Sequence, residues 1–265
     1  MKYFFDFSQE IIKRIQGAKD CALMFDFDGT LSKIAKTPRE AFLEKSTKDL
    51  IKKLNKNFCV AVVSGRDLSS VKSMIGLPGL IYAGNHGLEW QIGKKSENLH
   101  IDKKFQEDLA QIKNIFKSVA VNYPGISIED KLSNLSIHYR LLSEKACGDF
   151  LKKIKENILA VNKEGFFSVT KGKKVIEIRP KVAWDKGAFA KFLLQRIKVK
   201  NRHSCLAFYI GDDKTDEDAF VALSDGITIR IGKNKKSAAK YYIKNQKQID
   251  KLLLWLLKNI SKDSN

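Results

Sequence analysis

Two aspartates follow a buried, strand-like run near the N-terminus and are spaced for chemistry. Asp26 and Asp28 stand two positions apart directly after the apolar residues 21–25, so their side chains begin on the same side of the strand. Gly29 then lets the backbone turn sharply. Two carboxylates held this close require a cation or a shared proton, and a divalent metal with oxygen ligands is the usual cation. The alternative is an ordinary strand end with a turn rich in Asp and Gly.

A second acidic segment follows another apolar run late in the chain. Residues 211–218 read Gly-Asp-Asp-Lys-Thr-Asp-Glu-Asp. The acidic first turn of a helix, where carboxylates meet the helix dipole, accounts for Asp216 and the two acidic residues after it. It does not account for Asp212 and Asp213 beside the strand end, which is where a metal opposite Asp26 would lie.

Two further groups have the character of a phosphate site. Ser64-Gly65-Arg66 follows an apolar strand, where a hydroxyl and backbone amides at a helix N-terminus would hold phosphate oxygens. Lys186 precedes a late helix within the run Trp-Asp-Lys-Gly. Each has an ordinary explanation when taken alone, because Ser-Gly turns are common and a single lysine is more often a surface residue.

Alternating strands and helices must position these residues. Apolar runs separated by helical patterns predict core strands at 22–27, 58–63, 80–83, 205–210, 227–231 and 241–243. Apolar strands separated by helices predict a parallel sheet, and such a sheet binds its ligands at the carboxyl ends of its strands. Asp26, Ser64 and Gly84 all fall at such ends.

The alternation of single strands and helices ends after Gly93. From there to Pro180 the chain reads helix-strand-strand twice, with one helix marked by an apolar stripe from Phe105 to Val119 and a second expected at 143–161. This pattern predicts a small antiparallel sheet with two helices on one face, inserted as a separate module. We expect a first core segment, the inserted domain and a second core segment at residues 1–100, 101–181 and 182–265.

Composition limits the classes of partner. At 265 residues, 43% of them hydrophobic and 30% charged, the chain can bury a full core. No apolar stretch approaches the ~20 residues of a membrane span. We therefore expect no membrane contact. The four cysteines are widely spaced and fit no zinc motif, which indicates reduced thiols in a cytoplasmic protein. The apolar helix expected at 249–260 is read as packing on the sheet, and we expect a monomer or a weak homodimer.

The formal charge of +19 raises the possibility of nucleic-acid binding. The lysines, however, are spread through nearly every predicted helix and loop, and no aromatic–basic ladder accompanies them. A lysine-rich surface that steers anionic substrates explains the charge better. We therefore expect no nucleic-acid partner, and a polynucleotide phosphatase or another basic binding protein stays as the alternative from a different class.

Together these pieces resemble the haloacid-dehalogenase-like (HAD) phosphatase superfamily. The order Asp-x-Asp-Gly-Thr, a Ser after the second strand, a Lys before a late helix and Gly-Asp-Asp-x-x-Asp spans the whole chain. The resemblance implies an α/β fold with a Rossmann-like parallel-sheet core and an inserted α+β cap of the C2B type. It also implies that Asp26 is the nucleophile, that Asp28 is the general acid and base, and that Ser64 and Lys186 bind phosphoryl oxygens.

The same resemblance implies Mg²⁺ as the cofactor. The metal would be held by Asp26, the backbone carbonyl of Asp28, and Asp212. Asp213 and Asp216 would orient the metal ligands and Lys186.

Finer motifs resemble trehalose-6-phosphate phosphatases. They are Gly-Asn-His-Gly-x-Glu at 84–89, Glu-Asp-Lys at 129–131, His-Tyr-Arg at 138–140, Glu-Ile-Arg-Pro at 177–180, Trp-Asp-Lys-Gly at 184–187 and Gly-Asp-Asp-x-Thr-Asp-Glu-Asp at 211–218. The implied reaction is hydrolysis of trehalose 6-phosphate, a small sugar phosphate, to trehalose and phosphate. Phosphatases of sucrose 6-phosphate or mannosyl-3-phosphoglycerate, and a catalytically silent sugar-phosphate sensor, are the alternatives.

The resemblance also assigns residues that bind the substrate. Sugar hydroxyls would be bound in the inserted domain, and further contacts would come from the seam between the domains; the residues are Glu129, Lys131, Glu177, Arg66, Asn85 and His86. Without the resemblance, Glu129 and Lys131 read equally well as exposed turn charges. Glu177 lies between two isoleucines, so it faces away from them, toward solvent or a ligand.

Overall fold

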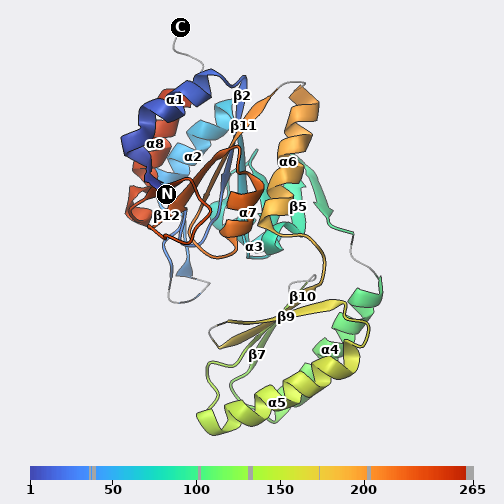
Figure 1. Ribbon diagram of the computed structural model, residues 1–265. Helices are drawn as coiled ribbons and strands as arrows, with labels where there is room; N and C mark the ends of the chain where they lie inside the picture. The colour runs from blue at the N-terminus through green and yellow to red at the C-terminus, as the bar shows by residue number, and fades with distance from the viewer. Residues whose placement is uncertain are drawn as a thin grey trace. The chain divides into compact units, whose positions relative to one another are not determined.

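In the computed structural model the chain forms two compact units (Figure 1). Unit 1 comprises residues Met1–Asn98 and Trp184–Asn265, and unit 2 comprises Leu99–Ala183. The residues that the structure describes are 1–35, 37, 40–100, 103–130, 134–172, 174–201 and 204–260.

A nine-stranded sheet forms the centre of unit 1, in the order β1-β13-β12-β11-β2-β3-β4-β5-β6. Its strands are β1 Lys2–Tyr3, β2 Asp20–Phe25, β3 Cys59–Val63, β4 Ile81–Gly84, β5 Glu89–Ile92, β6 Lys95–Asn98, β11 Cys205–Gly211, β12 Ile227–Ile231 and β13 Tyr241–Ile243. The pairs from β1 to β4 along this order are parallel, and only β4-β5 and β5-β6 are antiparallel. The predicted α/β core with a parallel sheet is therefore confirmed.

Helices cover both faces of this sheet (Figure 1). They are α1 Ser8–Gln16, α2 Lys45–Asn57, α3 Leu68–Ile75, α6 Lys186–Asn201, α7 Asp216–Ala222 and α8 Ile249–Ile260, with short 3₁₀ turns η1 Phe4–Phe7, η3 Asn85–Gly87 and η4 Gln246–Gln248. The helices α1, α2, α3 and α8 share one hydrophobic cluster with alternate residues of the central strands, such as Leu23 and Phe25. The helices α6 and α7 pack on β11 from the other face. Burial on both faces is why β2, β3 and β11 read as continuous apolar runs.

Unit 2 is a four-stranded antiparallel sheet in the order β7-β8-β10-β9, with two helices. Its elements are α4 Lys103–Val121, β7 Ser127–Asp130, β8 Leu135–His138, α5 Glu144–Val161, β9 Phe167–Gly172 and β10 Val175–Pro180. Alternate sheet residues, among them Ile137 and Ile176, join the apolar stripes of α4 and α5 in a second hydrophobic cluster. The other sheet face carries the polar residues between them, because side chains alternate along a strand.

Two regions of unit 1 differ from the pattern expected from the sequence. The N-terminal segment adds the edge strand β1 and the helix α1, which buries Ile11 and Ile15. Gly93, where the sequence pattern changes, is the turn of the β5-β6 hairpin and has a φ of 63°. The described helices include none that is both long enough and apolar enough to cross a membrane.

Candidate active site

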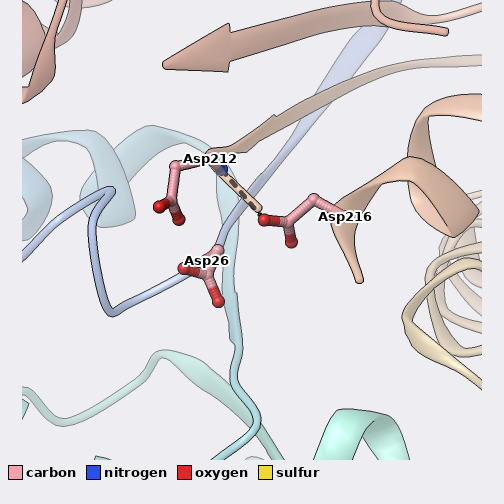
Figure 2. A group of neighbouring side chains, drawn as sticks. All are labelled: Asp26, Asp212 and Asp216. Carbon is pink, nitrogen blue, oxygen red and sulfur yellow. Dashed lines mark hydrogen bonds between the residues drawn. The ribbon is translucent and has the colours of Figure 1, made fainter. Parts of the chain in front are cut away.

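The acidic residues expected at strand ends lie together at the carboxyl ends of β2 and β11. These two strands are parallel neighbours, with Phe25 opposite Ile210, so the residues that follow them emerge side by side. The Asp26 amide donates to the Ile210 carbonyl at 2.8 Å and thereby continues the ladder. Carboxylate oxygens of Asp26, Asp212 and Asp216 lie within 4.8 Å of one another, and the three side chains converge (Figure 2).

Lys186 joins two of these carboxylates from the first residue of α6. Its Nζ donates to Oδ1 of Asp26 at 2.6 Å and to Oδ1 of Asp216 at 2.7 Å. The helix begins here because the Asp185 side chain accepts the Ala188 amide at 2.8 Å, which is an N-cap. Lys186 is 2% exposed, so its charge is compensated by carboxylates and not by water.

Asp216 is fully occupied by hydrogen bonds from the protein. Its Oδ2 accepts the backbone amides of Asp212 and Asp213 at 2.9 and 3.1 Å. Its Oδ1 accepts Lys186 and also the buried Tyr209 hydroxyl, at 3.0 Å. A carboxylate with four donors holds the loop and the lysine in place. Of the three carboxylates, Asp26 and Asp212 are therefore the better candidates for metal ligands.

Burial and mutual repulsion shape the electrostatics of this cluster. Burial raises the pKa of Asp26 well above its usual range, with the Asp216 carboxylate adding to the rise and the Lys186 ammonium opposing it. Burial also raises the pKa of Asp212 to about 6, helped by Asp216 and Asp213. Burial disfavours the Lys186 charge, but the Asp26 and Asp216 carboxylates outweigh it and raise its pKa. Several carboxylates thus share one ammonium, and a further cation would relieve their repulsion.

The first turn after β2 is shaped to receive Asp212. Gly29 has a φ of +82°, and a Cβ atom there would lie 2.2 Å from Oδ2 of Asp212. Only glycine allows this approach. Thr30 donates its hydroxyl to Oδ1 of Asp212 at 3.3 Å. The Gly and Thr of the first motif therefore orient the aspartate of the last one.

Asp28 lies on the same turn but is held by a different residue. Arg66 donates Nε to Oδ2 of Asp28 and Nη2 to Oδ1, both at 2.6 Å. This is a bidentate, charge-assisted pair. The sequence places both residues among the candidate site residues, but nothing in their spacing indicates that they pair with each other.

The phosphate-binding turn predicted after β3 is tightly closed. Ser64 is 1% exposed, and its Oγ accepts the Arg66 amide at 3.1 Å. Its carbonyl accepts the amide of His86, and the Arg66 carbonyl accepts the amide of Asn85 at 2.6 Å. Asn85 and His86 have φ values of 49° and 59°, so η3 folds back onto this turn. A Cβ atom on Gly65 would lie 2.8 Å from the His86 ring.

The predicted sugar-binding residues of unit 2 lie on the sheet face opposite its helices. Glu129 and Glu177 both stand opposite Ser136 in the strand register, so the three form one row. Glu129 is 3.3 Å from Nε2 of His138, and Glu177 accepts Nη2 of Arg179 at 2.6 Å. Lys131 lies outside the described residues.

Three contributors were missed by the sequence reasoning. Tyr209 supports Asp216, Thr30 supports Asp212, and Glu89 accepts the side-chain amide of Asn85. Thr30 and Glu89 stand inside the quoted motifs, so their motif positions were the available signal. Tyr209 lies two residues before Gly211 on β11, and the alternation of a strand could have placed it on the face that the site uses.

Comparison with known proteins gives a family match over most of the chain. Residues 24–248 match the sequence model of the trehalose-phosphatase family. Trehalose-phosphate phosphatase B of Arabidopsis thaliana is 32% identical over 258 residues, an alignment that covers 92% of this chain and 68% of the plant protein.

Solved structures agree with this match. A crystal structure of the trehalose-6-phosphate phosphatase of Aspergillus fumigatus superposes with a TM-score of 0.68 at 25% identity, covering 96% of this chain and 98% of the fungal one. A haloacid-dehalogenase-like hydrolase from Bacteroides thetaiotaomicron, at 13% identity, gives a TM-score of 0.64 over 89% of this chain and 99% of its own. The second likeness concerns the fold alone.

Proposed function

The chain belongs to the trehalose-phosphatase family, and we propose that it hydrolyses trehalose 6-phosphate to trehalose and phosphate through an aspartyl-phosphate on Asp26. One observation supports this most. Asp26 and Asp216 come from the two ends of the matched range 24–248, and Lys186 donates hydrogen bonds to both. Family membership makes the chain a phosphatase; the particular substrate, metal and intermediate are our proposal.

In the first half-reaction Asp26 attacks phosphorus. Lys186 occupies Oδ1, so Oδ2 is the oxygen that would form the new O–P bond. As the bond from phosphorus to the sugar oxygen breaks, Asp28 gives that oxygen a proton, and trehalose leaves. Lys186 and the Ser64 turn stabilise the charge on the phosphoryl oxygens.

In the second half-reaction water hydrolyses the aspartyl-phosphate. Asp28 accepts a proton from the water while the oxygen of the water bonds to phosphorus, and the O–P bond to Asp26 breaks. Phosphate leaves and the Asp26 carboxylate is restored. Asp216 keeps Lys186 and the Asp212 loop in place throughout, through the hydrogen bonds described above.

The donor set suits Mg²⁺. It consists of carboxylate oxygens from Asp26 and Asp212, held together by burial and short of positive charge, and Mg²⁺ prefers hard oxygen ligands. The backbone carbonyl of Asp28 is the third proposed ligand. When bound, the metal would neutralise charge between the nucleophile and the phosphoryl group.

We further propose that unit 2 is a C2B-type cap that binds the sugar part of the substrate. The two carboxylates in its row, those of Glu129 and Glu177 on either side of the buried Ser136, suit a ligand rich in hydroxyl groups. Lys131, Arg66, Asn85 and His86 complete the proposed set of substrate-binding residues.

A panel of sugar phosphates tests the proposal. Phosphate release is measured from trehalose 6-phosphate, sucrose 6-phosphate, mannosyl-3-phosphoglycerate and glucose 6-phosphate, with Mg²⁺ and with a chelator. We expect the highest kcat/KM for trehalose 6-phosphate and no turnover with the chelator. Equal or faster turnover of another glycoside phosphate would refute the substrate assignment while leaving the phosphatase assignment standing.

A further inference from the structure

The ion pair between Arg66 and Asp28 conflicts with the role proposed for Asp28. Both carboxylate oxygens of Asp28 accept hydrogen bonds from one guanidinium, at 2.6 Å each. The leaving sugar, and later a water molecule, must compete with the guanidinium for these oxygens. We therefore expect the pair to open, at least in part, during each turnover.

Hydrogen bonds hold the backbone on both sides of the pair, so the pair opens most easily through its side chains. Asp28 stands on the turn closed by the Gly29 amide and the Ser32 carbonyl at 2.8 Å. Arg66 is anchored on both sides, because its amide donates to Ser64 Oγ and its carbonyl accepts the Asn85 amide. Rotation about side-chain bonds breaks none of these backbone hydrogen bonds.

Exposure and packing indicate that Arg66 is the partner that needs a new anion when the pair opens. The Asp28 side chain is 41% exposed, while that of Arg66 is 13% exposed. The guanidinium carbon lies 5.6 Å from the centre of the Phe27 ring, a surface along which a planar cation can shift without losing its cation–π contact. A guanidinium that is largely shielded from water and leaves one anion needs a second anion close by.

The expected second anion is the phosphoryl group of the substrate. Arg66 is two residues from Ser64, whose hydroxyl is proposed to bind phosphate, and phosphate accepts the same two-pronged donation as carboxylate. We propose that Arg66 is a substrate-responsive latch: it holds Asp28 in the free protein and exchanges it for the phosphoryl oxygens when substrate binds, which releases Asp28 for its work. This latch rests on the proposed function of the site.

Phosphate affinity provides the test, because the latch makes phosphate compete with Asp28 for Arg66. Binding of inorganic phosphate in Mg²⁺ buffer is measured by calorimetry for the wild type, Asp28→Asn, Arg66→Met and the double variant. Removing the Asp28 charge tightens phosphate binding in any case. If the latch exists, Asp28→Asn increases phosphate affinity about tenfold more when Arg66 is present than in the Arg66→Met background. This is the order expected for a charge-assisted bidentate pair.

Each other result decides against the latch. An equal or larger gain in the Arg66→Met background means that Asp28 acts on phosphate only through its charge and that the pair is a static clamp. Unchanged phosphate affinity in Arg66→Met means that Arg66 never reaches the phosphoryl group. A wild type that binds no phosphate overturns the exchange as well.

A conservative variant guards against a folding artefact. Arg66→Lys keeps a positive charge but cannot form the two-pronged pair, so the additional gain from Asp28→Asn should shrink while phosphate affinity is partly retained. Thermal unfolding of all variants identifies any that fold poorly. Turnover of trehalose 6-phosphate by the wild type is followed in parallel, so that a wrong substrate assignment is distinguished from a wrong latch.

Discussion

The Nζ atom of Lys186 lies 2.6 Å from Oδ1 of Asp26, although the two residues are 160 positions apart. All of unit 2 lies between them in the chain. The contact therefore forms only when both segments of unit 1 have assembled around β2 and β11. Because it links a buried cation to a buried carboxylate, both the stability of this unit and its chemistry depend on it.

Replacing Lys186 by Met should destabilise the protein and abolish turnover. The variant leaves Asp26 and Asp216 buried without their shared cation, and removal of one partner from a buried pair costs about 3–5 kcal/mol. The free energy of unfolding from urea titration and phosphate release from trehalose 6-phosphate are the two measurements. Lys191→Met on the exposed side of the same helix is the matched control and should change neither. An unchanged free energy of unfolding in the Lys186 variant would show that the buried pair contributes little.

Replacing Asp26 by Asn should remove turnover and leave the fold. The amide has nearly the same size, and it relieves repulsion with Asp212 and Asp216. Lys186 keeps its hydrogen bond to Asp216, and burial already disfavours the charge of Asp26, so unfolding should occur at the same temperature or higher. It is not a nucleophile toward phosphorus, so kcat should fall by at least about a thousandfold. Phosphate release and circular dichroism are compared with the exposed control Asp49→Asn. Near-normal activity would show that the nucleophile is another residue.

Binding of Mg²⁺ should stabilise the protein through Asp212. A ligand that binds only the folded state raises the unfolding temperature as its concentration exceeds Kd. We expect Mg²⁺ to raise the melting temperature of the wild type and to have little effect on Asp212→Asn. Asp218→Asn is the control, because it removes a carboxylate of the same acidic segment on its exposed side. An equal rise in the Asp212 variant would exclude Asp212 as a ligand.

The gathering of the core residues could be predicted from the sequence because one physical rule positions them. Parallel strands end at a common edge, so residues that follow apolar runs in different parts of the chain meet there. Asp26, Ser64 and Asp212 follow this rule. The rule does not specify which side chain pairs with which, since that depends on rotamers and on turns that glycine permits. The pairing of Arg66 with Asp28 and the hydroxyl of Tyr209 on Asp216 became known only from the structure.

The helices and strands of unit 2 could also be predicted from the sequence, but the strands at the edges of the unit 1 sheet could not. Gly93 marks the change in pattern, and the sequence predicts no strand on either side of it before residue 101, whereas it is the turn of the β5-β6 hairpin of unit 1. The strand β5 alternates polar and apolar residues over only four positions, which is too short to stand out from a loop. The edge strand β1 has two residues and is held by its pairing with β13, an interaction distant in sequence.

Replacing Glu177 by Gln should weaken recognition of the sugar without affecting the phosphoryl chemistry. The variant keeps the shape of the side chain but loses its charge and part of its hydrogen bonding to Arg179. A sugar hydroxyl that donates to this carboxylate would lose a charge-assisted hydrogen bond, and such a loss costs about tenfold to a hundredfold in binding. We therefore expect kcat/KM for trehalose 6-phosphate to fall in this range, mainly through KM. Hydrolysis of p-nitrophenyl phosphate, which has no sugar, should be unchanged, as should both activities of Glu156→Gln on the exposed face of α5. An equal loss for both substrates would show that Glu177 acts on the fold or the chemistry and not on the sugar.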